Sequence, residues 1–143
     1  MEQITDAAVL KFLRNHEQEM ADLLTTLVEL ESPTNHKPSI DRLAAFLAEE
    51  LNYLGAEVET LRQIEAGNHV RARWGRGEGG ALLLCHMDTV WDVGTIADRP
   101  VRIQDGKLFG PGSEDMKGGI VVGLWALRAL RELDLMPTEP VTM

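Results

Sequence analysis

One stretch of the sequence limits the possible folds more than any other: an apolar run, residues 81–85, that leads directly into His86, Met87 and Asp88. A run of this length and composition is typical of a buried β-strand. Side chains alternate along a strand, so residues two apart point to the same side. If the strand continues to its tip, His86 and Asp88 face one cleft, where a carboxylate beside an imidazole suits a metal-binding histidine. The pattern alone favours the simpler interpretation, a strand end that faces solvent.

A second segment, residues 110–119, reads GPGSEDMKGG. It combines a Gly-Pro-Gly turn, an acidic pair and two glycines that open an apolar helix. Glycine allows positive φ angles and close approach of the backbone to a ligand. An acid at the start of a helix also gains from the helix dipole, so capping is the simpler role for Asp115. Taken alone, this segment indicates the start of a helix.

Together the two segments resemble the zinc-dependent aminoacylase and carboxypeptidase family, which includes glutamate carboxypeptidase, acetylornithine deacetylase and succinyl-diaminopimelate desuccinylase. The first motif of that family, His-x-Asp-Thr-Val, is matched by residues 86–90. The second, Gly-x-Gly-x-x-Asp-x-Lys-Gly-Gly, is matched by residues 110–119. The spacing between the motifs fits as well, and the amino-acid sequence of the segment is most similar to the glutamate carboxypeptidase branch of the family. The resemblance covers residues 20–143.

The resemblance implies roles for three side chains. His86 matches a ligand of one zinc ion, and Asp115 matches a carboxylate that bridges two zinc ions. Asp88 matches the catalytic-site acid that orients the histidine and tunes its charge. The resemblance also implies a cis peptide bond between Asp115 and Met116.

The fold implied by the resemblance is α/β, a three-layer zinc-exopeptidase-like catalytic domain with a mixed sheet flanked by helices. Residues 1–143 would be its N-terminal part. The implied reaction is hydrolysis of the amide bond of an N-acyl amino acid or of a C-terminal peptide residue. In the family, the next strand ends in a Glu-Glu pair that supplies the general base and a zinc ligand. Residues 140–143 look like the opening of that strand, so we expect a chain truncated before the Glu-Glu motif and inactive in isolation.

An alternative function belongs to a different class. The chain could be a non-catalytic α/β module, or a remnant, that keeps the scaffold and binds a partner chain. We also expect self-association, or association with a missing C-terminal portion, because a sheet that is cut short exposes apolar surface. A nucleotide-binding domain is disfavoured because no Gly-x-Gly-x-x-Gly follows the first strands.

Composition excludes several other partners. The net charge of −9 argues against nucleic acid and against an anionic membrane surface. No apolar stretch approaches the length of a membrane span, and residues 1–6 lack the features of a secretory signal. A single cysteine, Cys85, cannot form an internal disulfide, which is compatible with a reducing cytoplasm. We expect Cys85 to be buried under a helix rather than to bind metal.

Hydrophobic periodicity and turn residues predict the remaining elements. A helix is expected at about residues 6–30, with His16 exposed on it, and a second one from an N-cap at Ser39 to Gly55. Trp91 is expected either to line the pocket mouth or to pack. Strands are predicted at residues 57–61, 69–74, 81–86, 101–104 and 107–109. A hairpin turn is predicted at residues 75–80, and the last helix at residues 117–133.

Overall fold

The computed structural model describes residues 6–143, so residues 1–5 and the prediction about a signal segment lie outside it. The chain forms five helices, six strands and one wide helical turn within the described residues. The helices are α1 (Asp6–Asn15), α2 (Glu17–Glu29), α3 (Lys37–Tyr53), α4 (Thr95–Asp98) and α5 (Gly118–Glu132), and the wide turn is Ser113–Lys117. The strands are β1 (Glu57–Leu61), β2 (His69–Trp74), β3 (Ala81–Leu82), β4 (Arg102–Gln104), β5 (Lys107–Phe109) and β6 (Val141–Thr142).

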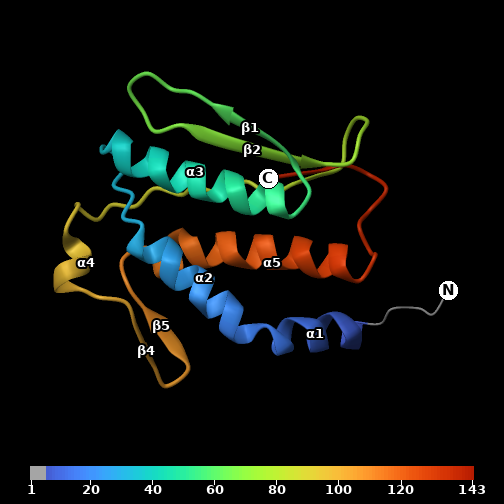
Figure 1. The fold of residues 1–143 in the computed structure, drawn as a ribbon, viewed down its shortest axis with the longest axis horizontal. Coiled ribbons are helices and arrows are strands. Elements are labelled where there is room, and N and C mark those ends of the chain that lie inside the picture. Colours follow the sequence, from blue (N-terminus) through green and yellow to red (C-terminus); the bar gives the residue numbers. More distant parts are fainter. Residues whose placement is uncertain (1–5) are drawn as a thin grey trace.

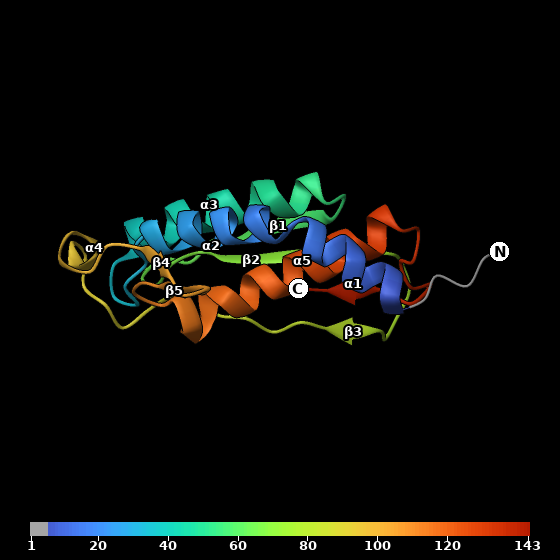
Figure 2. The same cartoon turned by 90° about the horizontal axis from the view of Figure 1, so that it is seen from below.

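The main sheet is mixed and has the strand order β1-β2-β6-β3. β1 and β2 are antiparallel, β6 is antiparallel to β2, and β3 is parallel to β6. α3 lies along β1 and β2, while α1 and α2 pack against α5. Figure 1 shows α3 beside the sheet and α5 between α3 and the two N-terminal helices. In Figure 2, α3 and β3 lie at opposite edges of the view, with β2 and α5 between them.

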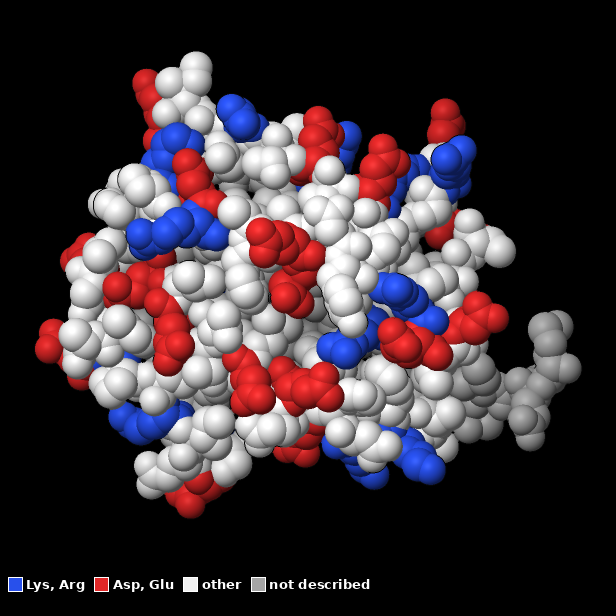
Figure 3. All heavy atoms as spheres, viewed as in Figure 1, with Lys and Arg blue, Asp and Glu red and all other residues white. Residues whose placement is uncertain are grey.

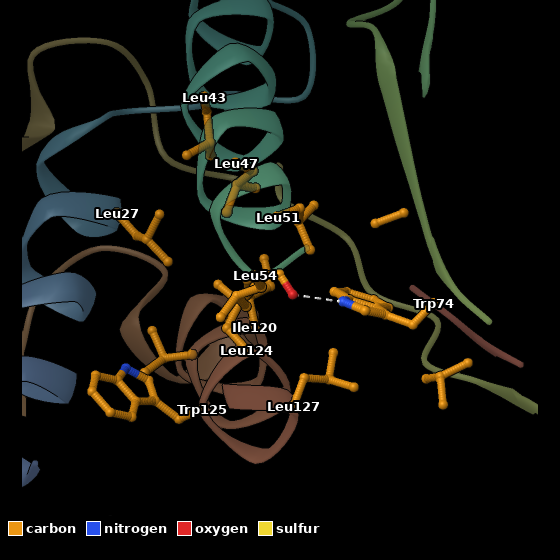
Figure 4. Close-up of a cluster of buried hydrophobic side chains, with 13 residues drawn as sticks. Leu27, Leu43, Leu47, Leu51, Leu54, Trp74, Ile120, Leu124, Trp125 and Leu127 are labelled. Atoms are coloured by element: carbon orange, nitrogen blue, oxygen red, sulfur yellow. Dashed lines mark hydrogen bonds between the residues drawn. The ribbon is translucent and has the colours of Figure 1, made fainter. Parts of the chain in front are cut away.

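The hydrophobic core lies between α3, α5 and the inner face of the sheet (Figure 4). Trp74 of β2 donates its indole N–H to the carbonyl of Leu54 at 3.0 Å, which joins the sheet to the end of α3. Burying one large aliphatic side chain contributes about 1.5–3 kcal/mol, so this cluster accounts for the stability of the helix–sheet contact. The labelled core residues are Leu27, Leu43, Leu47, Leu51, Leu54, Trp74, Ile120, Leu124, Trp125 and Leu127.

The predicted strand at residues 81–86 is wrong in length and in burial. Only Ala81 and Leu82 pair with β6, and the N–H of Leu83 adds one more bond, to the carbonyl of Thr142 at 2.8 Å. Residues 83–88 belong to no helix or strand, and Leu84 is 83% exposed. The reason is that β6 contributes two paired residues, and no other described strand runs beside residues 84–86.

The predicted hairpin at residues 75–80 is also wrong, because β6 lies between β2 and β3. Ala72 and Met143 exchange two backbone hydrogen bonds of 2.9 Å, which places the C-terminal segment beside β2. Gly80 allows this arrangement, since a Cβ atom there would lie 1.8 Å from the carbonyl oxygen of Pro140. The connection therefore crosses over β6 instead of turning back on β2.

The two N-terminal helix predictions need smaller corrections. The first helix is interrupted at His16, whose φ of −114° and ψ of 16° are not helical. His16 is half-buried rather than exposed, because its ring lies beside the rings of Phe12 and Trp125. The second helix begins at Lys37 after His36, not at Ser39, because Pro38 fits the first turn of a helix. Its end before Gly55 is confirmed.

Candidate metal centre

The structure brings together the three side chains that the sequence singled out. The Nε2 atom of His86 lies 2.9 Å from Oδ1 of Asp115. On the other side of the ring, Nδ1 lies 3.4 Å from Oδ1 of Asp88 and 3.1 Å from its carbonyl oxygen. The side chains of His86 and Asp115 are 48% and 87% exposed, so both are accessible to a ligand from solvent.

The loop of His86 is held in place by the chain that follows α2. Ser32 donates its hydroxyl to the carbonyl of Met87 at 2.7 Å, and the N–H of Thr89 bonds to the carbonyl of Ser32 at 2.8 Å. Thr34 donates to Oδ2 of Asp88 at 2.6 Å. Thr89 thus forms a single parallel bridge with Pro33. The side-chain contacts of Ser32 and Thr34 hold residues 87 and 88, which pair with no strand. The Ser-Pro-Thr sequence after α2 was the available signal, but on its own it indicates only the end of a helix.

Asp115 lies in the wide turn before α5, and the predicted cis peptide bond between Asp115 and Met116 is confirmed. Gly112 begins the turn with φ of 72°, and a Cβ atom there would lie 2.4 Å from Cγ2 of Thr89. The turn therefore packs directly on the His86 loop because residue 112 is glycine. The sulfur of Met116 also accepts a hydrogen bond from the backbone N–H of His86 at 3.2 Å.

Lys117 fixes the same turn to the C-terminal end of α2. Its side chain is 1% exposed, and its ammonium group donates to the carbonyls of Leu27 at 2.7 Å and Leu30 at 3.0 Å. These carbonyls belong to the last turn of α2, where a cation also gains from the helix dipole. Burial lowers the pKa of Lys117 to about 8, and the charge of Glu31 acts in the opposite direction. The second motif thus contains a buried lysine whose structural role was not apparent from the sequence.

The electrostatics of the centre favour a protonated imidazole. Partial burial works against the charge of His86, but hydrogen bonds to Asp115 and to the carbonyl of Asp88, together with the two carboxylate charges, outweigh it. The pKa of His86 is therefore raised above its ordinary value. A positive charge is thus stabilised between the two carboxylates.

The donor set fits part of a metal site. An imidazole nitrogen and a carboxylate oxygen are common zinc ligands, and metal-binding histidines often donate their second N–H to a carboxylate or a backbone carbonyl. His86 has both kinds of acceptor beside Nδ1 in Asp88. Within residues 6–143, however, no group of three or more ligand side chains is positioned to hold one ion. His86 and Asp115 carry two donors of the kinds that zinc binds, whereas zinc sites generally have three or four protein ligands.

Two hollows adjoin the centre. The first, of about 550 Å³, is mainly apolar and opens between β2 and residues 82–88, with His86 and Asp88 at its wall. The second, of about 520 Å³, includes Trp91 in its lining together with residues of the β4–β5 hairpin. Trp91 is absent from the lining of the first hollow and lies against Arg99, whose Cζ is 4.5 Å from the indole ring. Cys85 is half-buried, and burial raises the pKa of its thiol.

Comparison with known proteins places these features in a family. The model of peptidase family M20/M25/M40 matches residues 82–143. Carboxypeptidase G2 of Pseudomonas sp. (strain RS-16) is 35% identical over 123 residues, which are 84% of this chain and 30% of the relative. Acetylornithine deacetylase of Vibrio parahaemolyticus is 38% identical over 100 residues, 64% of this chain and 26% of the relative.

Solved structures agree on the fold. Human carnosine dipeptidase 1 superimposes with a TM-score of 0.80 at 22% identity, covering 94% of this chain and 32% of that one. An M20 family metallo-carboxypeptidase from Sulfolobus solfataricus gives a TM-score of 0.73 at 20% identity, covering 87% of this chain and 29% of that one. The fold is α/β, with a mixed sheet and packed helices, and is shared with these solved peptidases. The chain belongs to peptidase family M20/M25/M40 and spans about 30% of the length of carboxypeptidase G2.

A conservative change at Thr34 tests how the His86 loop is held. Thr34→Val keeps the shape of the side chain but removes the donor to Asp88, so we expect it to lower the free energy of unfolding by about 1 kcal/mol. Urea titration monitored by circular dichroism measures the change. Thr34→Ser should retain most of the stability, and Thr60→Val at an exposed position of β1 is the matched control. Equal stabilities for Thr34→Val and the unaltered chain would contradict this role.

Proposed function

We propose that residues 1–143 form the N-terminal part of the catalytic domain of a zinc-dependent hydrolase. Its substrates are the amide bonds of N-acyl amino acids or of C-terminal peptide residues. The observation that carries the proposal is the 2.9 Å contact between Nε2 of His86 and Oδ1 of Asp115. Two would-be ligands, distant in the sequence, meet where the family motifs lead us to expect a metal. The names of the relatives, a carboxypeptidase and several deacylases, support the substrate class.

Each side chain has a distinct task in this proposal. His86 presents Nε2 to a metal, while the backbone carbonyl of Asp88 accepts a hydrogen bond from Nδ1–H and so selects that tautomer, with the Asp88 carboxylate 3.4 Å from Nδ1. Asp115 offers its carboxylate from the opposite side. Zinc, when bound in such a site, lowers the pKa of a bound water and polarises the amide carbonyl. Thr34 positions Asp88 and Lys117 positions the Asp115 turn, so neither acts on substrate directly.

The chain by itself holds an incomplete site. The family has a Glu-Glu pair, its general base and a zinc ligand, at the end of the strand that β6 begins; the one Glu-Glu pair in residues 1–143, Glu49-Glu50, lies in α3 and does not match that position. Among the residues that the structure describes, no three His, Cys, Asp or Glu side chains are placed so that they could hold one metal ion. We therefore propose that the isolated chain is catalytically inactive. A cytoplasmic location stays a prediction from the single cysteine. Separately, none of the helices in residues 6–143 has the length and hydropathy needed to cross a bilayer.

Zinc affinity is the direct test of the partial site. We expect weak binding by the isolated chain, well below that of a site with three or four ligands, and further loss in His86→Ala and Asp115→Asn. Isothermal titration calorimetry on the metal-free chain measures this, with the exposed Asp92→Asn as matched control. Two tightly bound zinc ions per chain would contradict the incomplete site. Binding unaffected by either substitution would contradict the ligand assignment.

Catalysis is tested in a complete protein of the same fold. The aligned segment of carboxypeptidase G2 is replaced by this chain, and hydrolysis of N-acyl-glutamate and of a panel of dipeptides is followed by release of the free amino acid. We expect activity that His86→Ala abolishes and Asp92→Asn preserves, while the isolated chain shows none. Zinc content, measured on the same samples, reports whether the site has assembled. A chimera that contains zinc but hydrolyses none of these amides would contradict the proposed reaction.

The partner-binding alternative has one observation in its favour. The hollow of about 550 Å³ between β2 and residues 82–88 is lined mostly by apolar side chains and runs along unpaired backbone. An extended strand could pair there, as in recognition by strand addition. This surface is compatible with both functions, because the remainder of a catalytic domain would also cover it.

A further inference from the structure

The second hollow of the molecule has a chemistry that differs from that of the candidate metal centre. It measures about 520 Å³, within the range of small-molecule sites. We call it the cationic hollow and define it by Trp91, Arg99, Arg102, Lys107, Phe109 and Glu114. His86, Asp88 and Asp115 do not line it, although one wall is the Gly110–Glu114 part of the turn that carries Asp115.

Strand geometry accounts for half of this cluster. Arg102 of β4 is the cross-strand partner of Phe109 in β5. Lys107 is two residues from Phe109, so all three side chains lie on one face of the hairpin. The Cζ atom of Arg102 is 4.8 Å from the centre of the Phe109 ring. The cross-strand pair Ile103 and Leu108 lies on the other face of the hairpin. Leu108 also contributes to the lining of the hollow, whereas Ile103 does not.

Trp91 and Arg99 form a second stacked pair from a separate part of the chain. The guanidinium of Arg99 lies over the indole ring at 4.5 Å. A guanidinium stacked on an aromatic face keeps its in-plane N–H groups free, and these donors match the two oxygens of a carboxylate or phosphate. Two such stacked arginines therefore present preformed donors. Because the aromatic rings already restrict the rotamers of the arginine side chains, less conformational entropy would be lost when a ligand binds.

The three cations are not neutralised by the protein. Across residues 6–143, no carboxylate lies within ion-pair distance of the side chains of Arg99, Arg102 or Lys107. Among the 14 lysines and arginines, only Lys37, Arg71 and Arg128 form ion pairs within the described residues, so what distinguishes these three cations is their gathering around one hollow and the stacking of two of them on aromatic rings. Acidic side chains are spread over the face shown in Figure 3, and several lie next to basic ones. Glu114 is the one acid in the lining, so the hollow keeps a net positive charge.

We propose that the cationic hollow binds a small molecule that carries two or more oxyanion groups, either carboxylates or phosphates. Three positive groups exceed what a single carboxylate needs, and the two aromatic rings provide an apolar wall for the carbon skeleton of the ligand. The site is separate from the metal centre and does not depend on the proposed hydrolase function. Its occupant would touch the turn that leads to Asp115.

The test uses the metal-free chain labelled with ¹⁵N and two probes, citrate and pyrophosphate, at ionic strength matched with sodium chloride. The chain has three tryptophans, and Trp91→Phe assigns the indole N–H signal of residue 91. We expect that signal to shift saturably with a Kd below about 1 mM for at least one probe. The stronger probe identifies the class, carboxylate or phosphate.

The double variant Arg99→Gln/Arg102→Gln should weaken binding at least tenfold. Both side chains are exposed, so the remaining signals of the spectrum should show an unchanged fold. Arg62→Gln/Arg76→Gln removes the same charge elsewhere on the surface and should leave the Kd unchanged. Non-saturating shifts with both probes would overturn the proposal. Equal loss of affinity in both double variants would also overturn it, because the effect would then be one of net charge.

Discussion

Replacing Lys117 by methionine is expected to lower the free energy of unfolding by about 2–4 kcal/mol. Methionine has a similar volume, so the packing around residue 117 is largely kept. What is lost is the donor to the carbonyls of Leu27 and Leu30, which lie in the last turn of α2. A buried carbonyl without a hydrogen-bond partner destabilises the folded state by its full desolvation free energy. Urea unfolding measures the change, and Lys11→Met on the exposed side of α1 is the control.

The difference in the free energy of unfolding between the unaltered chain and Lys117→Met should depend on pH, which tests the same contact in a second way. Burial lowers the pKa of Lys117 to about 8 in the folded chain, whereas the unfolded chain has the ordinary value of 10.5. Between these values the unfolded chain binds more protons than the folded one, so the free energy of unfolding rises with pH. Lys117→Met should lack this rise. Parallel stability curves for the two proteins between pH 8 and 10, or equal stability at pH 7, would contradict the role of Lys117.

The second large effect concerns the edge of β6. Its pairing with β2 ends at the Ala72–Met143 bonds, and its pairing with the other neighbour ends at Leu83. Beyond these residues, β2 and residues 84–86 face each other across the apolar hollow. Unpaired backbone and exposed apolar side chains such as Leu84 favour association between copies. We therefore expect the isolated chain to self-associate at high concentration despite its net charge of −9.

An extension of five alternating Val and Thr residues after Met143 should continue β6 into the hollow and reduce this association. The register predicts that the first added residue pairs opposite Arg71. A Gly-Ser extension of the same length is the matched control and should have no effect, and Leu84→Lys should reduce association without filling the hollow. Light scattering over a concentration series measures the outcome. A stable, monodisperse monomer of the unextended chain would show that the chain is a self-sufficient domain.

Local patterns in the sequence predicted much of the fold. Alternating side chains and flanking turns indicated β1 and β2 with their observed bounds, and apolar spacing indicated α3 and α5. These predictions succeeded because a helix or a paired strand repeats its contacts over a few residues. The two motifs predicted that His86 and Asp115 would meet, through resemblance to known enzymes rather than through periodicity.

Contacts between distant segments were decided by the tertiary structure alone. Thr34 reaches Asp88 across 54 residues and Lys117 reaches Leu27 across 90, and no periodic pattern relates such pairs. The same reason explains the errors at residues 75–86, where β6 enters between two strands that are adjacent in the chain. The sequence by itself therefore determined which residues could form the centre and which elements carry them. The tertiary structure decided their distances, because these depend on the segment after α2 and on the buried ammonium group, which hold the two motif loops against each other.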